Sequence, residues 1–242
     1  MELSESTVLY RGRESTRCAC GIFAAMVKDA LFRWLSWLWP LPKARAQGRF
    51  GALEVRYEQG RAVLNSANGN QSFGSLHRVW QVAFQRIGLA RTPPANVLLL
   101  GLGGGSVPHI LIKELQLSPR ITAVEIDPAM VELAKVHFGG TSWTGTNIVE
   151  ADALMHVHID RERYDLVVVD LFEDLEMARG IDTSGFAHAL RDRCTGTLLF
   201  NTVGYDPESQ RRCDRIAQQL DKVFASVDEL RLEGVNRVFI AR

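Results

Sequence analysis

An apolar run that ends in a cluster of glycines is the feature of this 242-residue chain that most restricts its fold. The run VLLLGLGGGSVP spans Val97–Pro108, and a helical pattern and a second apolar run, TAVEID at Thr122–Asp127, follow it. Glycine lets the backbone turn tightly and approach a ligand closely. An acid roughly 20 residues beyond such glycines is placed to accept hydrogen bonds from both hydroxyls of a ribose. This order predicts a nucleotide site at the carboxyl edge of a parallel sheet; a tight turn without a ligand is the alternative.

From Asn96 onward the apolar pattern alternates between strand and helix periodicity. Strands are predicted at Val97–Gly101, Ile121–Glu125, Asn147–Glu150, Leu166–Asp170 and Thr197–Thr202. Helices are predicted at Gly105–Leu115, Pro128–Phe138, Ala153–Ile159, Thr183–Arg191 and Pro207–Val223. Two last runs, Ala225–Leu232 and Val235–Ala241, flank a Glu-Gly turn and predict a hairpin. The runs LLL and LVVV are typical of strands buried on both faces, so we predict an α/β, doubly wound, Rossmann-like sheet with a terminal antiparallel hairpin.

The residues before this sheet predict a small additional element. Residues 22–39 carry apolar side chains at helical spacing, with Asp29, Arg33 and Ser36 on the opposite face, and prolines follow. Residues 50–57 and 61–65 read as a β-hairpin, residues 65–74 as a loop and residues 75–88 as a helix. We therefore expect disorder at 1–25, an amphipathic helix and linker at 26–49, a hairpin-plus-helix element at 50–95 and the nucleoside-binding domain at 96–242.

The amphipathic helix is interrupted by Lys28, Asp29 and Arg33, so it is too polar to span a bilayer. Packing on its own domain or on a partner subunit is one interpretation, with a homodimer as the expected assembly. Shallow binding to a membrane surface through Trp34, Trp37 and Trp39 is the other.

Composition excludes some classes of function. Lys and Arg number 28 and Asp and Glu number 28, so the net charge of zero gives no support to a general nucleic-acid binder. The four cysteines (Cys18, Cys20, Cys194 and Cys213) show no zinc-ligand spacing, and neither do the histidines. Free thiols in a reducing cytoplasm, and no metal, are the expectation.

The predicted strands end in residues that suit ligand chemistry. Glu125 is the candidate ribose ligand, and Asp152 is placed to accept from the exocyclic amine of adenine or to cap a helix. Asp127 directly precedes a proline, so capping of the following helix is the alternative to a ligand contact there. Asp170 opens DLFED, which also contains Glu173 and Asp174. Clustered carboxylates repel one another unless a cation or a proton transfer uses them, so these three are the catalytic candidates; a solvated acidic loop is the alternative.

Four segments together resemble a known family: GLGGGS, VEIDPAMVELAK, EADA and YDLVVVDLFED. They are similar to the class I methyltransferase-like fold and, within it, to the spermidine synthases, over roughly Phe50 to the C-terminus. The resemblance implies a methyltransferase sheet that binds S-adenosylmethionine or its decarboxylated form. Glycine backbone at Gly101, Gly103 and Gly105 would contact the donor, Glu125 the ribose and Asp152 the adenine. Asp170 would position or deprotonate the attacking amine.

Three positions depart from the synthase pattern. Gly104 stands where the synthases carry an aspartate, Val79 and Trp80 stand near their Tyr–His pair, and the second loop acid lacks its following proline. These changes weaken recognition of a polyamine, which needs groups that face two ammonium ions. The sequence therefore predicts a cytoplasmic spermidine-synthase-like transferase that moves a methyl group to a small acceptor, such as an amine. An aminopropyltransferase and a non-catalytic nucleoside-binding protein are the alternatives.

Overall fold

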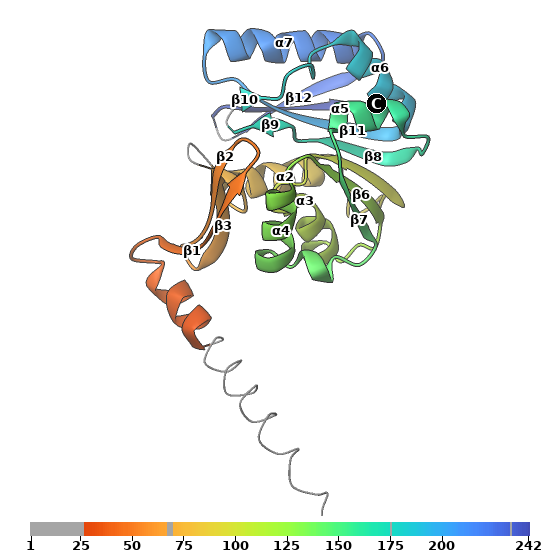
Figure 1. Ribbon diagram of the computed structural model, residues 1–242. Helices are drawn as coiled ribbons and strands as arrows, with labels where there is room; N and C mark the ends of the chain where they lie inside the picture. The colour runs from red at the N-terminus through yellow and green to blue at the C-terminus, as the bar shows by residue number, and fades with distance from the viewer. Residues whose placement is uncertain (1–26, 67–69, 175, 233) are drawn as a thin grey trace, which may run out of the picture. The chain divides into compact units, whose positions relative to one another are not determined.

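The computed structural model describes residues 27–242 apart from 67–69, 175 and 233 (Figure 1). Contacts divide the described chain into two compact units, one formed by residues up to 42 together with 57–61, and the other by residues 43–56 and 62–242. Residues 1–25, for which disorder is predicted, lie outside the described residues, and so do Cys18 and Cys20. Cys194 and Cys213 are free thiols, as expected, and both are buried.

The predicted α/β sheet is confirmed, with seven strands in the order β12-β13-β11-β8-β5-β6-β7. Their bounds are β5 Asn96–Leu100, β6 Arg120–Glu125, β7 Thr146–Glu150, β8 Tyr164–Val169, β11 Cys194–Val203, β12 Val227–Leu232 and β13 Asn236–Ala241. Five neighbouring strands pair in parallel, namely β11, β8, β5, β6 and β7, whereas β13 runs antiparallel to both β11 and β12. The chain moves outward from β5 through β6 to β7 and then returns to β8 on the other side of β5. Strand order therefore reverses beside β5, where ligands bind in doubly wound sheets.

Helices cover both faces of this sheet, because alternate residues of each buried strand point to opposite sides (Figure 1). Val97 and Leu99 join a core with α2, α3 and α4, and Leu98 and Leu100 join a second core with α5, α6 and α7. The helices are α2 Ser75–Arg86, α3 Ser106–His109, α4 Pro128–His137, α5 Ala153–Ile159, α6 Ser184–Arg193 and α7 Pro207–Asp221. The helix predicted over Gly105–Leu115 is α-helical only in α3 and continues as a π-helix at Ile110–Glu114, with a short 3-10 turn later at Gly140–Ser142.

A four-stranded sheet precedes the larger one, in the order β1-β2-β3-β4. The expected hairpin is β2 (Gly51–Glu58) with β3 (Arg61–Ser66), but β1 (Leu41–Gly48) and β4 (Asn70–Ser72) were missed. We expected a linker and a loop there. In β1 the residues packed against the core are the small Ala44 and Ala46 among polar neighbours, so its strand pattern is weak. The three residues of β4 are too few to show a period, and they form a strand only by pairing with β3.

The amphipathic segment is helical over residues 27–35, and its polar side bonds to the turn between β2 and β3. Ser36 accepts from the backbone N–H of Gly60 through Oγ at 2.9 Å and from Gln59 through its carbonyl at 3.0 Å. Asp29 accepts from the Tyr57 hydroxyl. The large apolar side chains of this segment are more than half exposed: Val27, Leu31, Trp34, Trp37, Leu38 and Trp39. No helix among the described residues is long and apolar enough to cross a membrane.

This exposed apolar face leads to a testable expectation about association. The double variant Trp34→Ser/Trp39→Ser should keep its melting temperature, because these side chains are 66% and 75% exposed. It should lose self-association or binding to anionic vesicles, since exposed apolar patches of this kind mark interaction sites. Light scattering after size exclusion and vesicle flotation measure the two. If both assays give the same result for variant and parent, the predicted subunit or membrane contact is wrong.

Candidate functional site

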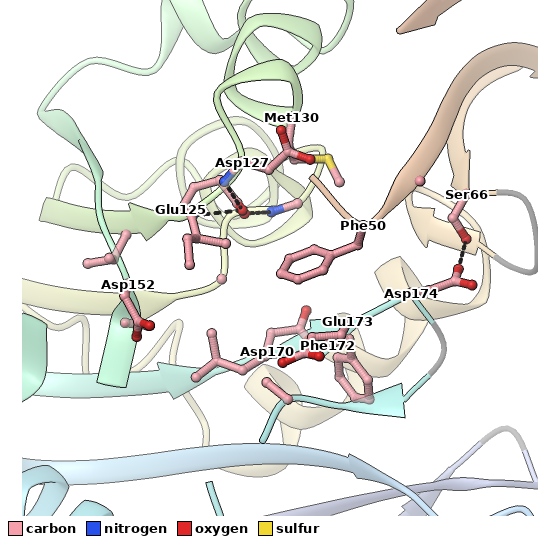
Figure 2. Close-up of a pocket in the computed structure, with 18 of the residues that line it drawn as sticks. Phe50, Ser66, Glu125, Asp127, Met130, Asp152, Asp170, Phe172, Glu173 and Asp174 are labelled. Carbon is pink, nitrogen blue, oxygen red and sulfur yellow. Dashed lines mark hydrogen bonds between the residues drawn. The ribbon is translucent and has the colours of Figure 1, made fainter. Parts of the chain in front are cut away.

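One pocket lies at the carboxyl ends of the central parallel strands, next to the switch in strand order (Figure 2). The structure brings together seven of the eight residues predicted for the site. These are Gly101, Gly103, Glu125, Asp152, Asp170, Glu173 and Asp174. The eighth, Gly105, does not line the pocket. The turn before β2 and the residues that follow it add an apolar wall, of which Phe50 is labelled in Figure 2.

The glycines after β5 are required by close packing. Gly101 has a φ of +91°, and a Cβ there would lie 2.1 Å from the backbone oxygen of Asp170. Gly105 has a φ of +89°, and a Cβ there would lie 1.8 Å from the ring of Trp143. Glycine at 105 therefore serves the contact with Trp143, while Gly101 lets the ends of β5 and β8 approach at the pocket.

We expect Gly101→Ala to lower the free energy of unfolding by about 1–3 kcal/mol beyond the cost of the positive φ alone, because the backbone must move to remove the overlap. Gly234→Ala is the matched control, since Gly234 has a φ of +76° with nothing within 4 Å of its Cβ position. Urea denaturation of both variants measures the difference. Equal losses of stability would show that the close approach at Gly101 has no cost.

Glu125 ends β6, and its buried carboxylate holds the glycine loop. Oε2 accepts from the backbone N–H groups of Leu102 and Gly103, each at 3.1 Å. Oε1 accepts from Ile126 at 2.9 Å and Asp127 at 3.0 Å. Burial raises the pKa of Glu125, and these four backbone bonds oppose the rise. The carboxylate thus ties the turn after β5 to the turn after β6 at the edge of the pocket.

Two further acids of the pocket cap helices. Asp127 accepts from the backbone N–H of Ala129 at 2.9 Å and begins α4, which confirms its capping role, and its other oxygen accepts from Arg49 N–H at 2.7 Å. Asp152 begins α5 through Oδ1, which accepts from Leu154 N–H at 2.8 Å. Asp152 is exposed and lines the pocket as well, so a cap and a ligand contact are compatible there.

Asp170 follows β8 at the floor of the pocket, and two neutral donors hold its carboxylate. Trp80 Nε1–H donates to Oδ2 at 3.0 Å, and Asn201 Nδ2–H donates to Oδ1 at 2.9 Å. Burial raises the pKa of Asp170 to about 6, although both hydrogen bonds lower it. A carboxylate with a pKa close to neutral suits transfer of a proton at physiological pH.

The structure corrects our interpretation of Trp80. From the sequence we inferred that Trp80 replaces one polar side chain of the synthases' Tyr–His pair and leaves no polar group there. The indole is fully buried, yet its N–H reaches the candidate base. Asn201 and its neighbour Asn236 were not singled out from the sequence. Asn201 lies in the buried strand β11, and a buried amide inside an apolar run was the signal that could have found it.

The acidic DLFED segment is a hairpin rather than a loop, with β9 at Phe172–Glu173 and β10 at Glu176–Met177. Asp174 has a φ of +62°, which aspartate tolerates in a tight turn, and it accepts a hydrogen bond from the Ser66 hydroxyl. Among the described residues, six carboxylates and one cation, Arg179, line the pocket. The six are Glu125, Asp127, Asp152, Asp170, Glu173 and Asp174. The pocket is therefore suited to cationic groups. No group of His, Cys, Asp and Glu among the described residues is arranged to hold a metal ion.

Comparisons with known proteins agree with this architecture. No protein-family model matches the chain. A polyamine aminopropyltransferase from Vibrio vulnificus is 30% identical over 48% of this chain and 42% of its own length. An eEF1A lysine and N-terminal methyltransferase homolog from Drosophila pseudoobscura pseudoobscura is 34% identical over 59% of this chain and 22% of its own length. The solved structure of human methyltransferase-like protein 13 in complex with SAH aligns with a TM-score of 0.58 at 26% identity, over 70% of this chain and 82% of that one.

The chain has the class I methyltransferase fold, and it is similar in sequence to spermidine-synthase-like transferases, which confirms the resemblance predicted from its motifs. These relatives are named for the transfer of an aminopropyl or a methyl group, and the aligned structure holds SAH, a relative of the expected donor. The chain spans less than half the length of the two curated relatives, 42% and 22%, so its own reaction is the subject of a proposal.

Proposed function

We propose that this chain is an S-adenosylmethionine-dependent transferase that moves a methyl group to an amine-bearing acceptor. The observation that carries the proposal is the single pocket in which the glycine turn, Glu125, Asp152 and Asp170 meet at the ends of four neighbouring strands. Ligands of doubly wound sheets bind at this edge, and the polar residues that follow these strands all line the same pocket there.

The residues present fit such a donor. The glycine turn leaves backbone exposed to the pocket. Glu125 borders the pocket beside this turn, where the ribose of a bound donor would lie. Because four backbone bonds already use the Glu125 carboxylate, a ribose must share or displace some of them. When bound, the donor would supply a methyl group on a positively charged sulfur, and the surrounding carboxylates favour that charge.

Asp170 is proposed to accept the proton that the acceptor nitrogen must lose. As the new N–C bond forms, the S–C bond breaks, its electron pair stays on sulfur, and the proton passes to the Asp170 carboxylate. Catalysis of this kind depends mainly on holding the nucleophile in line with the methyl group. Glu173 and Asp174 line the same pocket from the β9–β10 hairpin and would attract an ammonium group.

Aminopropyl transfer from the decarboxylated donor is the second candidate, and similarity to the Vibrio vulnificus protein favours it. Two departures from the synthase pattern support methyl transfer instead. Gly104 has no side chain, and Trp80 is fully buried with its indole N–H bonded to Asp170, so neither position offers an acceptor to an ammonium group. We therefore expect putrescine to be a poor acceptor. The pocket carboxylates can attract one ammonium group, but these two positions offer no acceptor for the other end of a diamine.

Calorimetric titration with S-adenosylmethionine, its decarboxylated form, methylthioadenosine and NAD tests the donor. Mass spectrometry of reactions with both sulfonium donors and a panel of amines tests the transfer. We expect binding of the adenosyl sulfonium compounds but not of NAD, and a product heavier by one methyl group. Efficient formation of spermidine from putrescine would establish the aminopropyltransferase instead, and the absence of adenosyl binding would refute both.

A further inference from the structure

Four polar side chains from four separate elements are joined in series at the base of the pocket. Asn236 of β13 donates through Nδ2 to Asn201 Oδ1 at 3.1 Å. Asn201 of β11 donates through Nδ2 to Asp170 at 2.9 Å, and Trp80 of α2 donates to its other oxygen at 3.0 Å. Trp80 and Asn201 are 0% and 1% exposed, so water does not compete for these bonds.

The groups in this series differ in how firmly the direction of their hydrogen bonds is set. An indole N–H is a donor only. The amide of Asn201 could in principle be turned around, but its oxygen would then face the Asp170 carboxylate and its NH2 group would face the NH2 group of Asn236. Both contacts would be repulsive while Asp170 is ionised and Asn236 keeps its observed orientation, so the carboxylate and Asn236 together favour the orientation in which Asn201 donates to Asp170. The network thus meets the carboxylate with two donors and no acceptor.

We infer that Trp80, Asn201 and Asn236 are positioning residues that hold Asp170 as a carboxylate and leave only its pocket-facing side open to a proton. This inference rests on the proposed function, in which Asp170 accepts the proton of the nucleophile. A proton between Asp170 and either donor would place hydrogen against hydrogen, so the proton must arrive where the acceptor lies. The charged groups that share the pocket are Glu125, Asp127, Asp152, Glu173, Asp174 and Arg179.

The network also predicts that an amide is a poor replacement for the carboxylate at position 170. An amide there has one oxygen, so its NH2 group must face either the Trp80 N–H or the Asn201 NH2 group. Asp170→Asn should therefore lose stability despite its similar shape. Adding Asn201→Asp should repair the series, because the carboxylate at 201 can accept from both the new amide and Asn236.

The Trp80 indole N–H provides a direct reporter of Asp170 in the whole chain. Its nitrogen NMR signal, assigned by its absence in Trp80→Phe, should titrate with a midpoint of about 6. The titration should vanish in Asp170→Asn, and its midpoint should rise by about one pH unit in Asn201→Leu, which removes a bond that favours the charged form. Trp143→Phe is the matched control and should leave the Trp80 titration unchanged, since Trp143 is buried and its Nε1 has no hydrogen-bond partner among the described residues. A midpoint that does not move in Asn201→Leu would overturn the inference.

The exchange of groups between positions 170 and 201 separates positioning from folding. Asp170→Asn should melt at a lower temperature than the parent, and Asp170→Asn/Asn201→Asp should recover most of that loss while transfer stays absent. A double variant no more stable than Asp170→Asn would overturn the inference. The proposed function would fail in a different way. Either adenosyl compounds would not bind, or Asp170→Asn would remain fully active although the Trp80 signal titrates in the parent protein.

Discussion

Asp170→Asn is expected to reduce transfer by about 10²–10⁴-fold, the range attributed to a general base, while nucleoside affinity changes little. Asp170 lies at the floor of the pocket with a pKa of about 6, so it is mostly ionised at pH 7 and can accept a proton. The amide removes both the charge and the basicity. Product formation with S-adenosylmethionine and the amine panel measures the first effect, and calorimetry measures the second.

The pH dependence of the parent enzyme provides a control with a definite sign. Since burial raises the pKa of Asp170 to about 6, the carboxylate becomes protonated below that pH and the base is lost. The rate should therefore fall as pH decreases through about 6, and this acidic limb should be absent from any residual activity of Asp170→Asn. Full activity of the variant at all pH values would remove Asp170 from the mechanism.

The sequence could predict which residues converge because parallel strands end at one edge of a sheet. Once β5, β6, β7 and β8 are recognised as parallel neighbours, Gly101, Glu125, Asp152 and Asp170 must lie close together. Local patterns determine each of these strands, and the acid that follows is read directly from the chain.

Contacts made across long distances in the sequence could not be predicted in this way. Trp80 precedes Asp170 by 90 residues, and at helical spacing it reads only as a core side chain. Ser66 reaches Asp174 across 108 residues from a segment that reads as a loop. Each contact depends on how α2 and the small sheet pack beside the large one, and periodicity contains no information about that packing.

Glu125 illustrates both cases. The strand pattern predicts its place at the end of β6, whereas its contacts with the glycine loop could not be predicted. A carboxylate that served only to bind a ribose would face the pocket with its lone pairs available to the hydroxyls. Here the carboxylate already accepts from four backbone N–H groups in two turns. The same side chain therefore shapes the glycine turn and borders the space where a ribose would lie.

Glu125→Ala is consequently expected to weaken binding of S-adenosylmethionine by about 1.5–3 kcal/mol, or roughly 10–150-fold in Kd, and to destabilise the fold as well. Glu125→Gln separates the two effects: its amide oxygen can still accept from one turn, but its NH2 group opposes the N–H groups of the other. We expect Glu125→Gln to keep more stability than Glu125→Ala and to lose a similar amount of affinity, because a neutral amide is a weaker acceptor for ribose hydroxyls. Calorimetry on variants shown to be folded by circular dichroism measures both. Unchanged affinity in a folded Glu125→Ala variant would show that Glu125 holds the loop and does not contact the nucleoside.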